Sequence, residues 1–198
     1  MKLGFITSIL QDYDFEQTID FAAKAGFQCM EVACWPRGKA ERRYAGVSHL
    51  DVANMNRAMA DQVQQLCKEK GVEISSLAYY PNTMDPDPQK RAEAIAHLEK
   101  VIDAAAMLDV NMVTTFIGRD QYKTTEENLE LFRQIWPAIK LPDAVWLGSV
   151  ARRPEPVHNP RAVEKNVWDD RQPVFWNQLR SIPFCMADDG LYSANLRF

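Results

Sequence analysis

The amino-acid sequence predicts an α/β fold in which parallel strands alternate with helices. Three observations carry this prediction through residues 1–139: short apolar segments recur, amphipathic segments of helical period follow them, and capping residues mark where helices begin. Strands that are apolar throughout and that alternate with helices form a parallel sheet covered on its outer side. Both an open doubly wound sheet and half of a (β/α)8 barrel satisfy this pattern.

The first two strand–helix units have clear boundaries. The run KLGFIT at 2–7 is expected to be a buried strand, and Asp14 with Gln17 has the spacing of a capping box that begins the next helix. Gly26 is a natural end for that helix. The second strand is expected at 29–33. A long loop separates it from a second helix, which closes with cations and a glycine in LCKEKG.

Two further units follow the same plan. The third strand is expected at 74–79 and the fourth at 112–116. Between them, Asp87-Pro88 has the cap-plus-proline arrangement that opens a helix. A second capping box at 124–127 opens the helix after the fourth strand, which runs to Trp136. We expect the four strands to lie parallel and adjacent in sequence order, each followed by an outer helix.

Composition excludes several classes of protein. The chain has 198 residues, a formal net charge of −4 and 46% hydrophobic residues, which is typical of a folded domain and not of a disordered chain. A nucleic-acid-binding protein would normally carry a basic face, so the acidic net charge leads us to expect no nucleic-acid partner. No apolar run approaches the roughly 20 residues of a membrane span, and the first residues read as a strand and not as a signal peptide. With four cysteines and no CxxC pair, we expect reduced thiols and a cytoplasmic protein.

A family resemblance narrows the fold. The chain contains, in this order, the segments KLGFITSI, GFQCMEVACWP, SSLAYYPN and VTTFIGRD, followed by a helix ending in IWP. Through them, residues 1–139 resemble the sugar phosphate isomerase/epimerase family of xylose isomerase-like TIM barrels. The resemblance implies a (β/α)8 barrel of the TIM type, of which this chain holds only the first four βα units. It also implies a divalent-metal-dependent enzyme, using Mn, Mg, Co or Zn, that isomerises or epimerises a small sugar or ketose.

The pattern ends near Ile139. Residues 140–198 have irregularly spaced prolines and neither a helical period nor clean strand alternation, so we expect them to supply none of barrel strands five to eight. The resemblance implies that the metal ligands come from motifs like ENCPM and DPSH in the second half of the barrel. Neither motif occurs in this sequence.

The genetic code offers a test of this irregular segment. With synonymous codons chosen freely, residues 140–147 read from the second base of each codon give NCPM, and 175–189 at the same offset give FDPSH. Both motifs arise in family order, at one constant offset and without a stop. We therefore interpret 140–198 as an aberrant tail, out of frame through a deletion or mis-called splice near Ile139. For this chain we expect no catalytic metal and no catalytic residue.

Five residues near the carboxyl ends of the predicted strands are candidates for substrate binding, because barrel active sites form at that end. Glu31 faces either substrate or a salt-bridge partner, and Trp35 either stacks on a sugar or packs under the long loop. Tyr80 and Asn82 either hydrogen-bond hydroxyls or serve a turn. Arg119 either binds a phosphate or carboxylate with its planar fork or is simply solvated.

Three functional hypotheses remain open. The first is a sugar (phosphate) isomerase/epimerase-like protein whose substrate is a small sugar, with this chain itself inactive. The second is a non-enzymatic truncated fragment that self-associates through uncovered barrel edges. The third is an apurinic endonuclease-like phosphodiesterase of the same fold, which the acidic charge and only three histidines disfavour. Of these histidines, His49 is expected in a loop or cap and His97 on the solvated side of the third helix.

Overall fold

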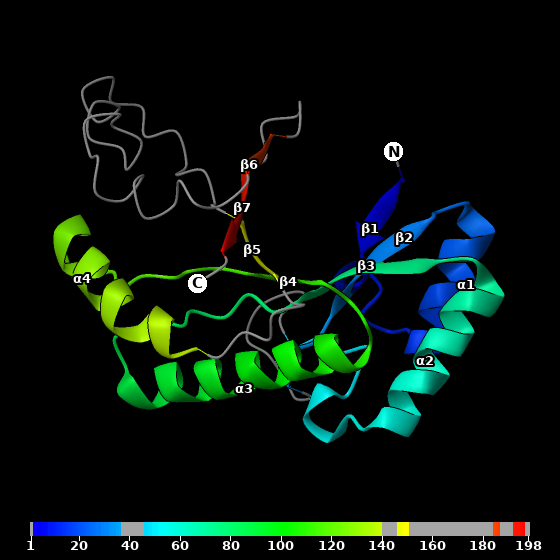
Figure 1. Cartoon of the computed structure of the whole chain (residues 1–198), viewed down its shortest axis with the longest axis horizontal. Coiled ribbons are helices and arrows are strands. Elements are labelled where there is room, and N and C mark those ends of the chain that lie inside the picture. The colour runs from blue at the N-terminus through cyan, green and yellow to red at the C-terminus, as the bar shows by residue number, and fades with distance from the viewer. Residues whose placement is uncertain (1, 37–45, 140–145, 151–183, 187–191, 197–198) are drawn as a thin grey trace.

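Four parallel strands form the centre of the molecule. The computed structural model describes residues 2–36, 46–139, 146–150, 184–186 and 192–196. Its sheet begins with β1 (Gly4–Ile6), β2 (Cys29–Ala33), β3 (Glu73–Ala78) and β4 (Met112–Thr115), which lie side by side in sequence order, each parallel to the next (Figure 1). This order confirms the predicted α/β fold and the expected adjacency of the four strands.

A helix follows each of these strands. Figure 1 shows α1 (Phe15–Ala25), α2 (Arg57–Lys70) and α3 (Pro88–Met107) on one side of the strands, while α4 (Thr125–Ile135) follows β4. Short 3-10 helices lie in the connections: η1 (Thr7–Ile9), η2 (Val52–Asn54) and η3 (Trp136–Ala138). The alternation of strand and helix is the one that the sequence predicts.

The helix boundaries follow from cap chemistry. The Asp14 side chain accepts a hydrogen bond from the backbone N–H of Gln17 at 2.8 Å, and the Gln17 side chain accepts one from the backbone N–H of Asp14 at 3.0 Å. Thr124 and Glu127 form the same reciprocal pair at the start of α4, and α3 begins at the predicted proline. Gly26 ends α1 with φ of 82°, a left-handed conformation that glycine adopts without strain.

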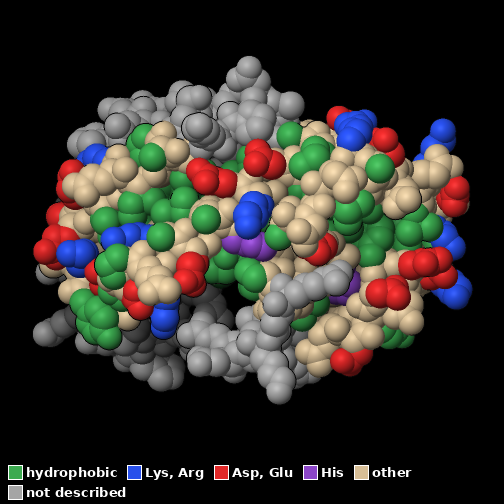
Figure 2. Space-filling view, turned by 90° about the horizontal axis from the view of Figure 1, so that it is seen from below, with side chains coloured by type: hydrophobic (Ala, Val, Ile, Leu, Met, Phe, Trp, Pro, Cys, Tyr) green, Lys and Arg blue, Asp and Glu red, His purple; other side chains and the backbone are tan. Residues whose placement is uncertain are grey.

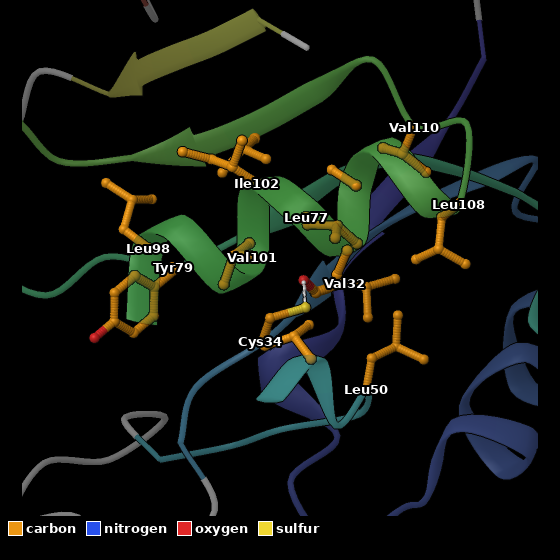
Figure 3. Close-up of a cluster of buried hydrophobic side chains, with 14 of the residues drawn as sticks. Val32, Cys34, Leu50, Leu77, Tyr79, Leu98, Val101, Ile102, Leu108 and Val110 are labelled. Carbon is orange, nitrogen blue, oxygen red and sulfur yellow. Dashed lines mark hydrogen bonds between the residues drawn. The ribbon is translucent and has the colours of Figure 1, made fainter. Parts of the chain in front are cut away.

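The face of the sheet that the helices cover carries the core. Among the strand residues, Met30, Val32, Leu77 and Val113 are fully buried in it. Figure 3 shows Val32 and Leu77 clustered with aliphatic side chains of α3 that include Leu98, Val101 and Ile102. Full burial of one such side chain contributes about 1.5–3 kcal/mol, so this face supplies much of the stabilisation of the fold.

The strands after residue 140 depart from expectation in one respect. β5 (Trp146–Val150) pairs in parallel with β4, although no barrel strand was expected there. β7 (Tyr192–Leu196) pairs antiparallel with β5, and β6 (Phe184–Met186) antiparallel with β7, so these two do not continue the parallel order. The expectation was wrong for β5 because a ladder is made by backbone groups, and the open edge of β4 accepts any short extended segment. Residues 140–145 and 151–183, on which the frame-shift interpretation mainly rests, lie outside the described residues.

The pairing of β2 with β3 contains one irregularity. Met30 pairs with Ile74 but Glu31 pairs with Ser76, so Ser75 is an extra residue in β3. The Ser75 hydroxyl donates a hydrogen bond to the carbonyl oxygen of Met30 at 3.1 Å. This β-bulge re-aims the rest of β3, and it brings Ser76 beside Glu31.

His97 of α3 is buried, and the expected solvated position was wrong. It is 9% exposed, and its Nε2 lies 2.8 Å from the carbonyl oxygen of Cys34. Cys34 immediately follows β2, where its carbonyl group gives the ring a hydrogen-bond partner inside the core. The polar residue therefore belongs to the apolar side of α3 because the sheet supplies an acceptor there.

The outer surface of the helices is mixed in charge. Figure 2 shows Asp, Glu, Lys and Arg side chains dispersed among apolar ones on this side of the molecule. Among the residues that the structure describes, no helix combines the length and the apolarity needed to cross a bilayer. Cys29, Cys34 and Cys67, the cysteines whose side chains are described, are free thiols.

Candidate functional site

Glu31 lies in a polar cluster on the face of the sheet opposite the helices, which we call the inner face. It is the third residue of β2, between Met30 and Val32 of the core, so strand alternation turns its side chain to the inner face. Its Oε2 accepts a hydrogen bond from Oγ of Ser76 at 2.9 Å, and its Oε1 accepts one from the hydroxyl of Tyr80. The two donors stabilise a carboxylate that would otherwise be costly on a sheet face.

No cation pairs with Glu31 among the described residues, where the ion pairs involve other carboxylates. The structural alternative of a salt-bridged glutamate is therefore not realised in that part of the chain. A carboxylate offers about four lone-pair sites, and two donors occupy only part of them. Glu31 thus retains capacity to accept hydrogen bonds from a ligand.

Tyr80 follows β3 by two residues and extends the cluster to β4. Its hydroxyl oxygen lies 3.1 Å from Oγ1 of Thr114, besides donating to Glu31. Burial raises the pKa of Tyr80, and the nearby charge of Glu31 and their hydrogen bond raise it further, so the phenol remains a donor. The Tyr80 ring packs against Trp35, with ring centroids 5.6 Å apart, and against Phe116, at 4.7 Å.

Asn82 joins two loops through its side-chain amide. Its Oδ1 accepts hydrogen bonds from the backbone N–H of Arg119 at 2.9 Å and of Met84 at 3.1 Å, and its Nδ2 donates to the carbonyl oxygen of Arg119 at 2.7 Å. Gly118 has φ of 78°, and a Cβ there would lie 2.0 Å from Oδ1 of Asn82, so this close approach requires glycine. Asn82 therefore holds the loop after β4 against the loop after β3, with one amide hydrogen left for a ligand.

Arg119 is held by its backbone, and its side chain is exposed. Among the described residues, no acceptor is bonded to its guanidinium group, which leaves it available to an anion. No hydrogen bond or ring contact within the described chain joins Asn82 or Arg119 to the cluster around Glu31. The five candidate residues thus form two groups: Glu31, Trp35 and Tyr80 in one, and Asn82 and Arg119 in the other.

A second polar network ties the ends of β1 and β2 together. Nε2 of His49 lies 3.2 Å from the carbonyl oxygen of Leu10, which can only accept, so this nitrogen carries the proton of the neutral ring. Nδ1 of His49 then accepts a hydrogen bond from the Thr7 hydroxyl at 3.0 Å, and Oγ1 of Thr7 accepts one from the backbone N–H of Ala33 at 2.9 Å. Burial lowers the pKa of His49 and favours this neutral form.

The described residues do not fit a divalent metal site. Within the described ranges, no group of three or more His, Cys, Asp or Glu side chains converges on one point. His49 and His97 each place a ring nitrogen on a backbone carbonyl oxygen, and both carboxylate oxygens of Glu31 hold hydrogen bonds. We therefore assign no metal-dependent step to these residues.

Open space adjoins Glu31 on the side of β1. A shallow depression there is lined by Gly4, Phe5, Ile6, Glu31 and Ser75. It gives a small molecule access to the neighbourhood of the carboxylate.

Sequence reasoning missed three partners in the cluster: Ser76, Thr114 and Phe116. Strand alternation alone does not identify Ser76, because ISSLAYY alternates regularly only when one serine is set aside in the bulge. Thr114 and Phe116 lie two residues apart in and after β4, and so are on one face. The spacing of two residues between Thr114 and Phe116 was visible in the sequence TTF. That spacing identifies a site only when the residue of β3 that pairs with each of them is known.

Comparisons with known proteins agree with this architecture. A family model described as the xylose isomerase-like TIM barrel matches residues 19–141. Among solved structures, the IolI protein with a binding zinc atom has 14% sequence identity and a TM-score of 0.51, over 75% of this chain and 51% of that chain. A xylose isomerase domain protein from Alicyclobacillus acidocaldarius has 16% identity and a TM-score of 0.50, over 75% and 49%.

A further similar structure is D-psicose 3-epimerase from Clostridium cellulolyticum H10 with D-tagatose, at 20% identity and a TM-score of 0.48, over 69% of this chain and 48% of that chain. The chain spans about half the length of these solved structures. Among curated proteins, none matches this sequence. At these identities, the structural likeness shows the fold alone.

Proposed function

Because this chain belongs to the xylose isomerase-like TIM barrel family, we propose that its four βα units derive from a sugar isomerase/epimerase that acts on a small sugar or ketose. The family match over residues 19–141 is the observation that carries this proposal. The candidate side chains Glu31, Tyr80 and Trp35 support it, because a carboxylate, a phenol and an aromatic ring near strand ends suit a ligand with hydroxyl groups.

We divide the chain into a half-barrel at residues 1–139 and an aberrant tail at 140–198. The family match ends at residue 141, close to the boundary that composition predicts. The antiparallel pairing of β7 and β6 also supports a change of character after the half-barrel, since a TIM barrel is built from parallel strands. The polypeptide as written is then a non-enzymatic relative of an active enzyme.

The nucleotide sequence around the codons for Ile139 and Lys140 tests this division directly. A restored reading frame would encode an ENCPM-like and a DPSH-like motif, whose carboxylates and imidazole suit a divalent metal. An uninterrupted frame that encodes residues 140–198 as written, and that is conserved as protein, would contradict the proposal.

The activity is tested with two versions of the protein, this chain and a frame-restored chain with the missing segment rebuilt. We expect stoichiometric Mn, Mg, Co or Zn and turnover of a ketose panel for the restored version, and neither for this chain. Zinc belongs in the set because the IolI structure contains it. Turnover with bound metal by the chain as written would contradict the frame-shift interpretation. Absence of turnover by a folded restored version would contradict the function.

The outer edge of β1 supports self-association with a second copy. Within the described residues, β1 pairs only with β2, which leaves backbone donors and acceptors along its other edge. Exposed apolar side chains lie nearby in the sequence, at Leu3, Ile9, Tyr13 and Phe21. We expect a concentration-dependent increase in mass by light scattering, which Leu3→Lys in this edge region reduces. A monodisperse monomer at all concentrations would contradict it.

A further inference from the structure

The chemistry of the inner face distinguishes between two kinds of sugar ligand, and this inference rests on the function proposed above. Glu31 bears a negative charge, and the side chains bonded to it, Ser76 and Tyr80, are neutral. No Lys or Arg of the described residues lies within ion-pair distance of it. The charge of this carboxylate is therefore uncompensated by the protein in the described part of the chain.

We propose that Glu31 and Tyr80 form a recognition pair for an uncharged, hydroxyl-bearing sugar, and that this pair disfavours the corresponding sugar phosphate. The carboxylate accepts hydrogen bonds from ligand hydroxyl groups with its remaining lone pairs. A phosphate near it would meet a like charge, with no compensating cation among the described residues, and like charges at an interface reduce affinity. The pair thus selects by charge as well as by hydrogen bonding.

The geometry holds both members of the pair in place. Ser76 fixes one carboxylate oxygen at 2.9 Å, and Thr114 lies 3.1 Å from the hydroxyl oxygen of Tyr80. Trp35 and Phe116 pack on the Tyr80 ring, with centroids 5.6 and 4.7 Å away. A preorganised acceptor loses little conformational entropy when a ligand binds, so each hydrogen bond contributes more to affinity.

In the described part of the chain, the alternative site for an anion, at Arg119, is weaker. Arg119 is exposed, and it belongs to the separate group built around Asn82. A single solvated cation gains little from an ion pair in water. We therefore expect the repulsion at Glu31 to outweigh any attraction at Arg119.

The test is binding of D-fructose and of D-fructose 6-phosphate to the full chain, by ligand-observed NMR titration. We expect the phosphate to bind at least about tenfold more weakly than the free ketose at low ionic strength. The difference between the two affinities should become smaller as the salt concentration is raised, because salt screens the repulsion between the phosphate and Glu31. This measurement needs no variant. Equal affinities, tighter binding of the phosphate, or no binding of either sugar would overturn the inference.

Variants assign the effect to the pair. In Glu31→Gln the ratio of the two affinities should fall toward one, and in Tyr80→Phe the affinity for fructose should fall about three- to tenfold. Glu73→Gln is the matched control. Glu73 is an exposed carboxylate at the start of β3, at the end of that strand away from Tyr80, and it pairs with Lys2. This control should leave the ratio unchanged. An unchanged ratio in folded Glu31→Gln would overturn the role of Glu31.

The proposed function is judged by a separate measurement, turnover by the frame-restored version. A restored enzyme that turns over a ketose, while this chain binds fructose and fructose 6-phosphate equally, would overturn the charge selection and leave the isomerase function standing. A folded restored enzyme with no turnover, while this chain still prefers the free ketose, would overturn the function and leave the recognition pair standing.

Discussion

The two faces of the same four strands differ in how their side chains are stabilised. On the helix-covered face, Met30, Val32 and Leu77 are fully buried in an apolar cluster whose members are held by shape and dispersion. Figure 3 shows Val32 and Leu77 in this cluster. On the inner face, Glu31 and Tyr80 are held by directional hydrogen bonds. The comparison teaches that neighbouring residues of one strand can serve different ends: Met30 and Val32 stabilise the fold, while Glu31 between them belongs to the candidate site.

The largest effect is expected on the helix-covered face. Leu98→Ala removes a fully buried side chain from the cluster of Figure 3 and should lower the free energy of unfolding by about 2–5 kcal/mol. Urea denaturation followed by circular dichroism measures it. Leu3→Ala, at a position 65% exposed, is the control and should change stability by less than about 0.5 kcal/mol. A loss at Leu98 as small as that of the control would break the comparison.

The second-largest loss of stability is expected where the loop after β4 contacts the loop after β3. Gly118→Ala combines a positive φ with a Cβ 2.0 Å from Oδ1 of Asn82, so we expect a loss of about 2–3 kcal/mol. Gly26→Ala has a similar φ but meets nothing within 4 Å, and should cost only about 1 kcal/mol. The same unfolding assay compares them. Equal losses would mean that the Asn82 side chain moves away from a Cβ at position 118 without a cost in stability.

The inner face should show a smaller, chemically specific effect. Tyr80→Phe removes the hydroxyl that donates to Glu31 and lies beside Thr114, with an expected loss of about 1–2 kcal/mol. The adjacent Tyr79 is a matched control: Figure 3 shows its hydroxyl end directed away from the labelled aliphatic side chains, and no hydrogen bond of that hydroxyl is found among the described residues. Tyr79→Phe should change stability by less than about 0.5 kcal/mol. A larger loss for Tyr79→Phe would reverse the assignment.

The smallest effect is expected from pH. Burial is the main cause that lowers the pKa of both His49 and His97 from the ordinary value of 6.5. Below pH 6.5 the unfolded chain then binds more protons than the folded one, so the free energy of unfolding falls as pH drops toward the folded pKa values. The stabilisation that the two neutral histidines contribute is fully present above pH 6.5. Urea midpoints measured in steps across this window check the slope. The double variant His49→Asn, His97→Asn should flatten it, and a slope that persists unchanged would assign the effect to other groups.

Local chemistry made much of the fold predictable. The pairs Asp14 with Gln17 and Thr124 with Glu127 identify helix starts because the bonds lie within one turn, and they are visible in sequence without any tertiary information. The order of the four strands follows from alternation with helices. The boundary near Ile139 stays a prediction, and β5 shows that a segment with no regular pattern still pairs when a strand edge is open.

The site was less predictable, because its contacts depend on register. Glu31 and Tyr80 were both candidates, but their hydrogen bond joins residues 49 positions apart and requires knowledge of the bulge in β3. His97 was misplaced for a related reason. It precedes the buried Leu98 in α3, and the acceptor that makes its burial favourable is a carbonyl group of Cys34, which no side-chain pattern reveals.

The extra residue in β3 indicates where this strand can change length during evolution. Loss of either serine codon at 75 or 76 gives the same protein, in which Ile74 still pairs with Met30 and a serine still pairs with Glu31. Loss of a codon elsewhere in β3 would instead turn the residues on one side of the gap to the opposite face. A three-nucleotide deletion at this point costs one hydroxyl bond to the Met30 carbonyl and leaves the Glu31 cluster in place. We therefore expect the serine pair to tolerate gain or loss of a codon, while a change of length elsewhere in β3 disrupts the two faces.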